Sequence, residues 1–167
     1  MKSIALIGLM GSGKSTIGAI LANKLNLKFV DIDAQIEAKV GTTITEIFAQ
    51  KGEDFFRQIE SEVLYDFAKT EGRIISTGGG AVQNENNLKT LQNNCITIYL
   101  KTSPEVLFER VKNDNTRPLL HNENPLEILR ELFKKREANY QKAAIIVVTD
   151  GKTTDEIVKE IIKNVKS

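Results

Sequence analysis

The chain has 167 residues, of which 41% are hydrophobic and 27% are charged. These proportions are those of an ordinary folded protein rather than a disordered or membrane-spanning chain, and the length fits one domain, 1–167. The 23 basic residues are matched by 22 acidic ones, so the composition lacks the basic excess that a nucleic-acid backbone requires. With no signal-peptide pattern and no apolar run near about 18 residues, we expect a cytoplasmic protein without a membrane partner.

Five short apolar runs predict buried strands, and stretches with helical periodicity lie between them. Strands that alternate with helices indicate an α/β fold, in which helices cover both faces of a parallel sheet. Thr43, Asn124 and Thr153 are expected to cap three of the helices. The only cysteine, Cys95, falls in the fourth run and is expected to be buried as a small hydrophobic residue. The five runs are 3–7, 28–30, 73–76, 95–100 and 145–148.

Residues 8–15, GLMGSGKS, match the phosphate-binding pattern G-x-x-x-x-G-K-[ST] between the first strand and the first helix. Glycines let successive backbone N–H groups turn toward one point, and the helix N-terminus adds positive charge there. Lys14 is expected to reach the β- and γ-phosphates of a nucleotide, and Ser15 to ligate Mg²⁺. The alternative is a glycine turn without nucleotide, but a chance match to this pattern is rare.

The carboxylates after the second strand are candidates for the metal and the acceptor. The third strand ends in Ser76 instead of the aspartate of a Walker B strand, so another carboxylate must help to hold the metal. Asp31 and Asp33 are two residues apart, and in an extended backbone both would point to the same side. We expect one to support Mg²⁺ through water and the other to accept a hydrogen bond from an acceptor hydroxyl. The alternative is that Asp33 only caps the next helix.

Two arginines lie on or beside the apolar stripes of predicted helices. Glu60 falls inside one stripe, and Arg57, three residues earlier, is within reach to pair with it. Arg136 occupies the stripe of a later helix, where a permanent charge must be paired or bind an anion. Together they suggest a carboxylate or phosphate on the acceptor. The alternatives are an ordinary ion pair at Arg57 and a snorkelling side chain at Arg136.

Two further segments follow later strands. Glycines 78–80 would let the backbone approach another group closely, although a plain tight turn is the alternative. Residues 113–124 form a polar stretch that we expect to act as a mobile lid. In this stretch, Arg117 is expected to close on the phosphates and stabilise transition-state charge, with a solvated loop arginine as the alternative. His121, the only histidine, is expected to be solvated.

The order and spacing of six motifs resemble one family, the shikimate kinases, across essentially the whole chain. The motifs are GLMGSGKST (8–16), DID (31–33), FRQIE (56–60), GGG (78–80), RPLL (117–120) and KRxxxY (135–140). The resemblance implies a three-layer P-loop kinase fold with a lid, in which helices flank a five-stranded parallel sheet of order 2-3-1-4-5. It also implies transfer of the ATP γ-phosphoryl group, with Mg²⁺, to the 3-hydroxyl of shikimate. The products would be shikimate 3-phosphate and ADP, in chorismate and aromatic amino-acid biosynthesis.

The resemblance further implies a role for each site residue, in a protein expected to be a monomer. The catalytic residues would be Lys14, Asp33 and Arg117. Shikimate would be bound by Asp33, Arg57, Gly79 and Arg136, and the Mg²⁺ shell would include Ser15 and Asp31. ATP would be bound by Gly11, Ser12, Gly13, Lys14, Ser15, Thr16, Arg110 and Arg117. The family's last adenine-contacting stretch is poorly matched at 150–154, where Thr153 is the residue assigned.

Two other functions remain open at this point. The first is a related small-molecule kinase, such as a gluconate or nucleotide kinase, which a panel of acceptors would distinguish. The second is a P-loop nucleotide switch, since GTPases carry the same loop. The chain lacks the N-K-x-D element expected of a guanine-nucleotide-binding protein, however. The nearest match, NKLN at 23–26, has no aspartate. A kinase assay with and without shikimate would separate a switch from an enzyme.

Overall fold

The computed structural model of the chain describes residues 1–114, 121 and 123–167, in which strands and helices alternate. The strands are β1 (Ser3–Ile7), β2 (Lys28–Asp31), β3 (Arg73–Ser76), β4 (Cys95–Lys101) and β5 (Ile145–Val148). The α-helices are α1 (Lys14–Leu25), α2 (Ile32–Val40), α3 (Ile44–Ala68), α4 (Glu85–Asn94), α5 (Pro104–Val111), α6 (Pro125–Tyr140) and α7 (Thr154–Lys166), and a short 3₁₀ helix, η1, spans Ala81–Gln83. No helix in these ranges is long and apolar enough to cross a membrane.

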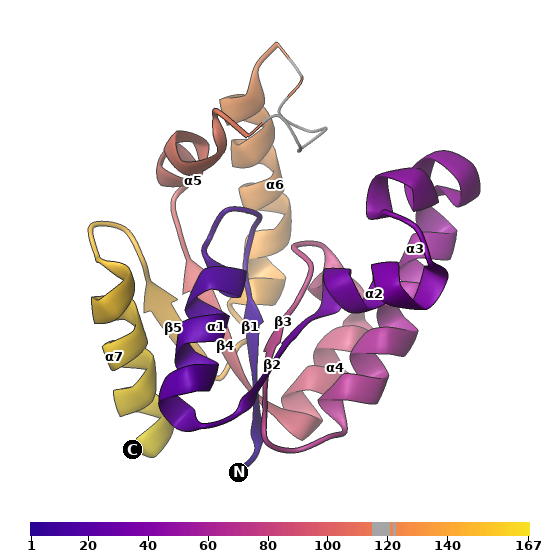
Figure 1. Cartoon of the computed structure of the whole chain (residues 1–167). Helices are drawn as coiled ribbons and strands as arrows, with labels where there is room; N and C mark the ends of the chain where they lie inside the picture. The colour runs from indigo at the N-terminus through magenta and orange to yellow at the C-terminus, as the bar shows by residue number, and fades with distance from the viewer. Residues whose placement is uncertain (115–120, 122) are drawn as a thin grey trace.

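The five strands form one parallel sheet in the order β2-β3-β1-β4-β5 (Figure 1). The predicted α/β fold and strand order are therefore confirmed. All five predicted strands are present, and β2 and β4 each extend one residue beyond their predicted ends, to Asp31 and Lys101. The extension of β2 matters for the site, because it carries the first of the two candidate aspartates.

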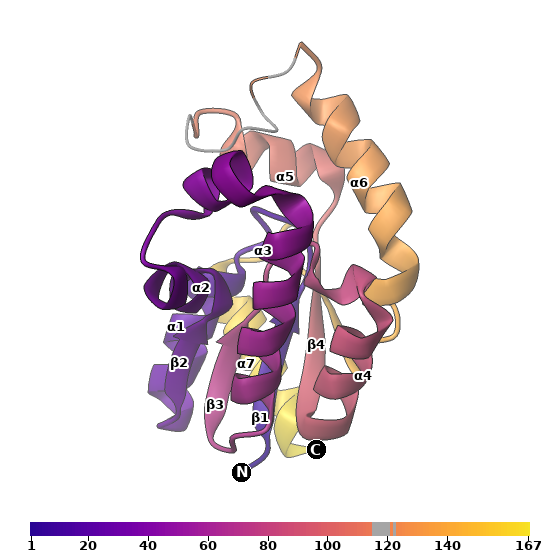
Figure 2. The same cartoon turned by 90° about the vertical axis from the view of Figure 1, so that its right-hand side faces the viewer.

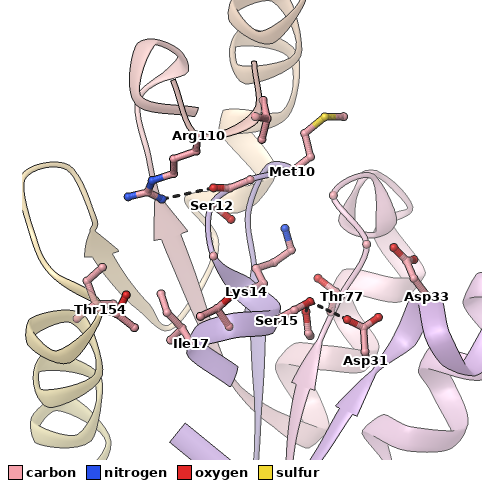
Figure 3. Close-up of a pocket in the computed structure, with 18 of the residues that line it drawn as sticks. Met10, Ser12, Lys14, Ser15, Ile17, Asp31, Asp33, Thr77, Arg110 and Thr154 are labelled. Carbon is pink, nitrogen blue, oxygen red and sulfur yellow. Dashed lines mark hydrogen bonds between the residues drawn. The ribbon is translucent and has the colours of Figure 1, made fainter. Parts of the chain in front are cut away.

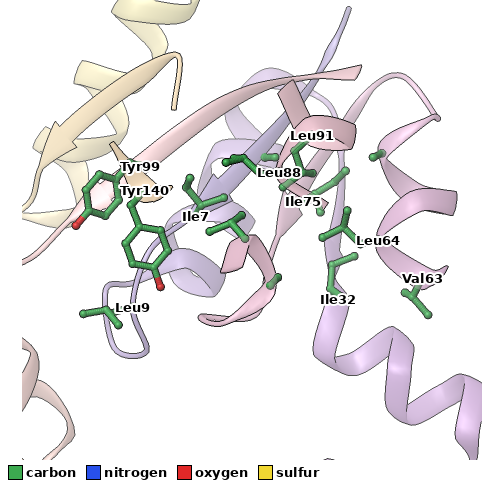
Figure 4. Close-up of a cluster of buried hydrophobic side chains, with 14 of the residues drawn as sticks. Ile7, Leu9, Ile32, Val63, Leu64, Ile75, Leu88, Leu91, Tyr99 and Tyr140 are labelled. Carbon is green, nitrogen blue, oxygen red and sulfur yellow. The ribbon is translucent and has the colours of Figure 1, made fainter. Parts of the chain in front are cut away.

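Side chains that alternate along the strands form a separate apolar core on each face of the sheet. In β1, Ala5 and Ile7 pack into one core, which also receives residues of α3 and α4, whereas Ile4 and Leu6 pack into the other, against α1 and α7. Figures 1 and 2 show these two helical layers on opposite faces, and Figure 4 shows part of the first core. All four β1 side chains are fully buried, and burial of each large aliphatic side chain contributes about 1.5–3 kcal/mol. Cys95 lies in the first core, as predicted.

Strand register brings the candidate site together at the carboxyl end of the sheet. Ser76 at the end of β3 pairs with Leu6 of β1 on one side and with Asp31 of β2 on the other. The loop after β1, the first aspartate and the segment after β3 therefore emerge side by side. Helices α2, α5 and α6 lie around the same end (Figure 1).

Helix caps follow the sequence in two of the three predicted cases. The hydroxyl of Thr43 accepts from the Glu46 amide at the start of α3, and Thr153 forms a full capping box with Glu156 at the start of α7. Asn124 occupies the N-cap position of α6, but its side chain makes no capping hydrogen bond, so Pro125 in the first turn fixes the start of that helix. Inside α3, Gly52 has φ 81° and ψ 174°, which kinks the helix there.

Candidate active site

The loop between β1 and α1 has the conformation that the glycine pattern predicts. Gly8, Gly11 and Gly13 have φ angles of 148°, 77° and 94°, which side-chain-bearing residues rarely adopt. Space is short as well, because a Cβ at Gly8 would lie 2.9 Å from the Leu100 carbonyl oxygen and one at Gly11 would lie 2.6 Å from Cγ1 of Val111. The loop leads directly into the N-terminus of α1, so its backbone N–H groups and the helix dipole favour an anion.

Lys14 is the first residue of α1 and is only 8% exposed. Its Nζ donates hydrogen bonds to the carbonyl oxygens of Gly8 and Leu9, at 2.7 and 2.9 Å. The loop's own backbone therefore holds the ammonium group beside the point where a phosphate would bind. Figure 3 shows Lys14 at the same end of the sheet as Ser15, Asp31 and Asp33.

Ser15 and Asp31 form the predicted hydroxyl and carboxylate pair. Ser15 Oγ donates to Asp31 Oδ2 at 2.7 Å (Figure 3), and it lies 3.3 Å from Ser76 Oγ. These three side chains offer hard oxygen donors, which Mg²⁺ prefers. Within the described part of the chain, no group of three or more His, Cys, Asp or Glu side chains could hold a metal by itself, so phosphate oxygens and water would have to complete the shell.

The extended geometry predicted for the two aspartates is wrong. Helix α2 begins at Ile32, so Asp33 lies in its first turn instead of continuing the strand. Asp31 ends the strand because its Oδ1 accepts from the Ala34 amide at 3.3 Å, which makes it the N-cap. The alternative that Asp33 caps the helix is therefore wrong too. Both aspartates nevertheless line the same pocket.

The carboxyl of Asp33 is largely enclosed by protein. Burial raises its pKa above the ordinary value, the negative charge of Asp31 adds to the shift, and the charge of Lys14 opposes it. A carboxylate with a raised pKa accepts a proton more readily than a solvated one. Asp33, which lines the pocket beside the phosphate-binding loop, is thus a candidate acceptor for a hydrogen bond from a ligand hydroxyl.

Arg57 and Glu60 form the predicted ion pair on α3. Nη1 of Arg57 lies 2.7 Å from Oε1 of Glu60, whose side chain is only 1% exposed. The other oxygen, Oε2, is buried and has no hydrogen-bond partner among the described residues. Burial raises the pKa of Glu60, and the nearby Arg57 charge opposes that shift. Glu60 fixes the guanidinium but leaves other N–H donors of Arg57 for a ligand.

The three glycines after β3 make room for the charged groups of the site. A Cβ at Gly78 would lie 2.7 Å from Glu60 Oε2, one at Gly79 would lie 3.3 Å from Arg136 Nη1, and one at Gly80 would lie 2.6 Å from Arg57 Nη2. None of the three has a positive φ, so the segment needs glycine for space and not for torsion. The alternative of a plain tight turn does not explain these close approaches.

A pocket of about 480 Å³ joins the phosphate loop to the two aspartates and the glycine segment. Arg57 and Arg136 approach this segment from α3 and α6, at Gly80 and Gly79. Arg117 lies outside the described residues, as does most of the predicted lid. The predicted site residues that line the pocket are Gly11, Ser12, Gly13, Lys14, Ser15, Thr16, Asp31, Asp33, Gly79 and Arg110.

Sequence reasoning missed several lining residues, among them Thr77 and, within the poorly matched stretch 150–154, Lys152 and Thr154. Thr77 directly precedes the glycine segment, which is the signal that could have identified it. Thr153, the residue that the family resemblance assigns near the adenine, does not line this pocket, and its side chain caps α7 as predicted. Arg110 is exposed, and its Nη1 donates a hydrogen bond of 3.4 Å to the carbonyl oxygen of Gly11 in the phosphate-binding loop (Figure 3).

The arrangement is suited to phosphoryl transfer. The phosphate-binding loop, a fixed lysine, oxygen ligands for a metal and the Asp33 carboxylate line the pocket. Arg57 and Arg136 do not line it, but their guanidinium groups lie against the adjoining glycine segment. Catalysis of phosphoryl transfer rests on positioning and on neutralising charge. The acceptor that this geometry favours has a hydroxyl for Asp33 and an anionic group for the arginines.

Comparison with known proteins agrees with this chemistry. The model of the shikimate kinase family matches residues 10–166. The shikimate kinase of Sulfurihydrogenibium sp. is 46% identical over 166 residues, which cover 99% of each chain. A solved shikimate kinase from Acinetobacter baumannii, in complex with shikimate, superposes with a TM-score of 0.94 at 36% identity and covers 99% of this chain and 93% of that one. A gluconokinase from Sinorhizobium meliloti, with a TM-score of 0.67, 16% identity and coverage of 99% and 91%, shares the fold alone. The chain therefore belongs to the shikimate kinase family.

Proposed function

We propose that the chain catalyses the Mg²⁺-dependent transfer of the ATP γ-phosphoryl group to the 3-hydroxyl of shikimate, as a cytoplasmic monomer of one domain. The observation that carries the proposal is the placement of Asp33, Arg57 and Arg136 around one glycine segment, next to a phosphate-binding loop. This set of groups complements an acceptor that carries both hydroxyl and carboxylate groups. The reaction would yield shikimate 3-phosphate and ADP for aromatic amino-acid biosynthesis.

The nucleotide side of the pocket would bind ATP through the loop and α1. The backbone of Gly11, Ser12 and Gly13, with Thr16 at the helix start, would surround the phosphates, and Lys14 would contact the β- and γ-phosphates. Ser15 and Asp31 fit Mg²⁺, which when bound neutralises charge on the phosphate oxygens. Two further residues would bind the nucleotide: Arg110, beside the base, and Arg117, which would close over the phosphates with the lid at about 113–124.

The acceptor side would hold shikimate against the glycine segment. Arg57 and Arg136 would bind the carboxylate through paired N–H donors, and the Gly79 backbone would contact the ring. Asp33 would accept a hydrogen bond from the attacking hydroxyl and so orient its oxygen toward the phosphorus. The raised pKa of Asp33 suits a group that also has to receive a proton as that hydroxyl reacts.

A coupled ADP-release assay with a panel of acceptors tests this function. Shikimate, gluconate and a nucleoside monophosphate would each be supplied with ATP and Mg²⁺, beside a reaction without acceptor. We expect rapid ADP release only with shikimate. Equal or faster turnover with gluconate, whose kinase shares the fold, would refute the proposed substrate. ADP release that does not depend on any acceptor would instead indicate a nucleotide switch.

A further inference from the structure

Two buried tyrosines stack beside the acceptor side of the site. Tyr99 lies in β4 and Tyr140 is the last residue of α6. Their ring centroids are 5.0 Å apart with an interplanar angle of 28°, and both residues are at most 1% exposed. Figure 4 shows the two rings side by side in the apolar core. The rings share one environment, but their hydroxyls bind different groups.

The hydroxyl of Tyr140 points to the acceptor site. It donates a hydrogen bond to the carbonyl oxygen of Gly79, in the segment against which shikimate is proposed to bind. Arg136 lies one helical turn earlier on α6, and its Nη1 would be 3.3 Å from a Cβ at Gly79. Burial raises the pKa of Tyr140 to about 12, although the nearby charge of Arg136 opposes the shift. The hydroxyl therefore keeps its proton at neutral pH and remains a donor.

The Gly79 carbonyl and the Gly80 N–H belong to one planar peptide unit. A hydrogen bond that fixes the carbonyl therefore also fixes the tilt of this unit and the position of Gly80. Arg57 rests directly on Gly80, where a Cβ would lie 2.6 Å from Nη2. Tyr140 thus holds the segment that both guanidinium groups approach: Gly79 directly, beside Arg136, and the Gly80 backbone under Arg57 through the peptide plane.

The hydroxyl of Tyr99 points to a separate cluster. It donates to Glu137 Oε2 at 2.5 Å, while Oε1 of the same carboxylate lies 2.9 Å from Lys101 Nζ and 2.5 Å from Gln141 Nε2. Loss of the Tyr99 hydroxyl would leave two of these three contacts in place. Burial would raise the pKa of Glu137, but the three hydrogen bonds lower it, so the carboxylate is well satisfied without contributing to the pocket.

We propose that Tyr140 is a positioning residue for the acceptor, and that its hydroxyl aligns the Gly79–Gly80 peptide with the two arginines that bind the acceptor carboxylate. The inference rests on the proposed function, because it assumes an anionic acceptor at this wall. The stacked, buried ring has no room to turn its hydroxyl elsewhere, so the bond to Gly79 is made before substrate arrives. Such preorganisation lowers the cost of binding.

The test compares Tyr140→Phe with Tyr99→Phe, which each remove one hydroxyl from the same stack and keep both rings. For Tyr140→Phe, we expect the KM for shikimate to rise roughly five- to thirtyfold, equivalent to about 1–2 kcal/mol, with the KM for ATP unchanged. For Tyr99→Phe, both Michaelis constants should stay within about twofold of wild type. Melting temperatures measured for both variants show whether the two deletions perturb the core to a similar extent.

Four results would overturn the inference. Equal rises in the shikimate KM for both variants would mean that the stack only supports the fold. An unchanged shikimate KM in Tyr140→Phe would mean that the hydroxyl does not position the acceptor site, and a matching rise in the ATP KM would mean that its effect is general. Wild-type protein that fails to phosphorylate shikimate would overturn the proposed function itself, and this inference with it.

Discussion

Replacement of Gly80 by alanine is expected to displace Arg57 without disturbing the fold. Gly80 has φ −94° and ψ −3°, a conformation of turns that is open to alanine as well as to glycine. The new Cβ would lie 2.6 Å from Nη2, 2.9 Å from Nη1 and 3.0 Å from Cζ of Arg57. These atoms form the end of a flexible side chain, so the guanidinium would retreat while the backbone stays in place.

The geometry gives the size of the effect. Ordinary contact with a Cβ begins at 3.4 Å, so Nη2 must move by about 0.8 Å from its position at 2.6 Å. Arg57 cannot move that far and keep both its 2.7 Å bond to Glu60 and its alignment with a carboxylate ligand. Hydrogen bonds to charged groups contribute about 1.5–3 kcal/mol. We therefore expect the KM for shikimate to rise about 10- to 100-fold, with the KM for ATP unchanged.

Steady-state kinetics with ATP and shikimate varied separately, together with thermal unfolding, would measure this effect. The matched control is Gly41→Ala, because Gly41 has φ 82° and open space around its Cβ position. Alanine there is strained by roughly 1–2 kcal/mol, so this variant should lose stability and keep its shikimate KM. Gly80→Ala should lose acceptor affinity, and it should also lose stability to the extent that Arg57 leaves the buried Glu60 carboxylate, so the shikimate KM, and not the melting temperature, separates the two variants.

Two results would refute the reasoning. If Gly80→Ala bound shikimate as the wild type does, then the position of Arg57 would not matter for the acceptor. If Gly41→Ala raised the shikimate KM to the same extent, then the effect of either substitution would reflect general destabilisation.

Two further predictions concern the charged groups of the pocket. Lys14→Ala should abolish turnover in the ADP-release assay, because the ammonium held at the loop is the charge nearest the phosphates; activity within about tenfold of wild type, about 1.4 kcal/mol, would contradict that role. Burial raises the pKa of Asp33 in the folded protein, so the folded state binds a proton on this carboxylate more tightly than the unfolded chain does. The free energy of unfolding therefore falls as the pH rises from the ordinary Asp pKa of 3.8 through the raised pKa of the folded state. Asp33→Asn should therefore unfold at a higher temperature than wild type at neutral pH, lose this advantage as the pH falls toward the ordinary Asp value of 3.8, and lack turnover at every pH. Lower stability of the variant at neutral pH would contradict the linkage argument.

Much of the fold follows from local patterns in the sequence. The strands were predictable because each is a short apolar run bounded by polar or glycine residues, as in 3–7 followed by the phosphate loop. The pairing of Arg57 with Glu60 was predictable for a similar reason, since a carboxylate on an apolar helical face has few partners within reach. The strand order was not available from these patterns, because it depends on contacts between distant segments, and only the family resemblance supplied it.

The parts of the site that the sequence did not predict depend on competition between local structures. The spacing of Asp31 and Asp33 is compatible with a strand. The Asp31 carboxylate caps α2, however, so the helix begins at Ile32 and includes Asp33. Lys152 gave no signal, because a loop lysine becomes a pocket residue only through the packing of α7 near α1. The glycine segment predicted a close approach but not the identity of the groups that approach, which come from α2, α3 and α6.

The site contains charged groups that the rest of the described chain does not fully satisfy. Glu60 is buried with one carboxylate oxygen without a hydrogen-bond partner in the described part of the chain, and burial raises the pKa of Asp33. Buried, incompletely paired charges reduce stability, so these residues are poorly explained by folding alone. A ligand that brings a hydroxyl to Asp33 and a carboxylate to the two arginines would offset part of that cost on binding. The same groups that reduce stability would thus contribute affinity and orientation for the acceptor.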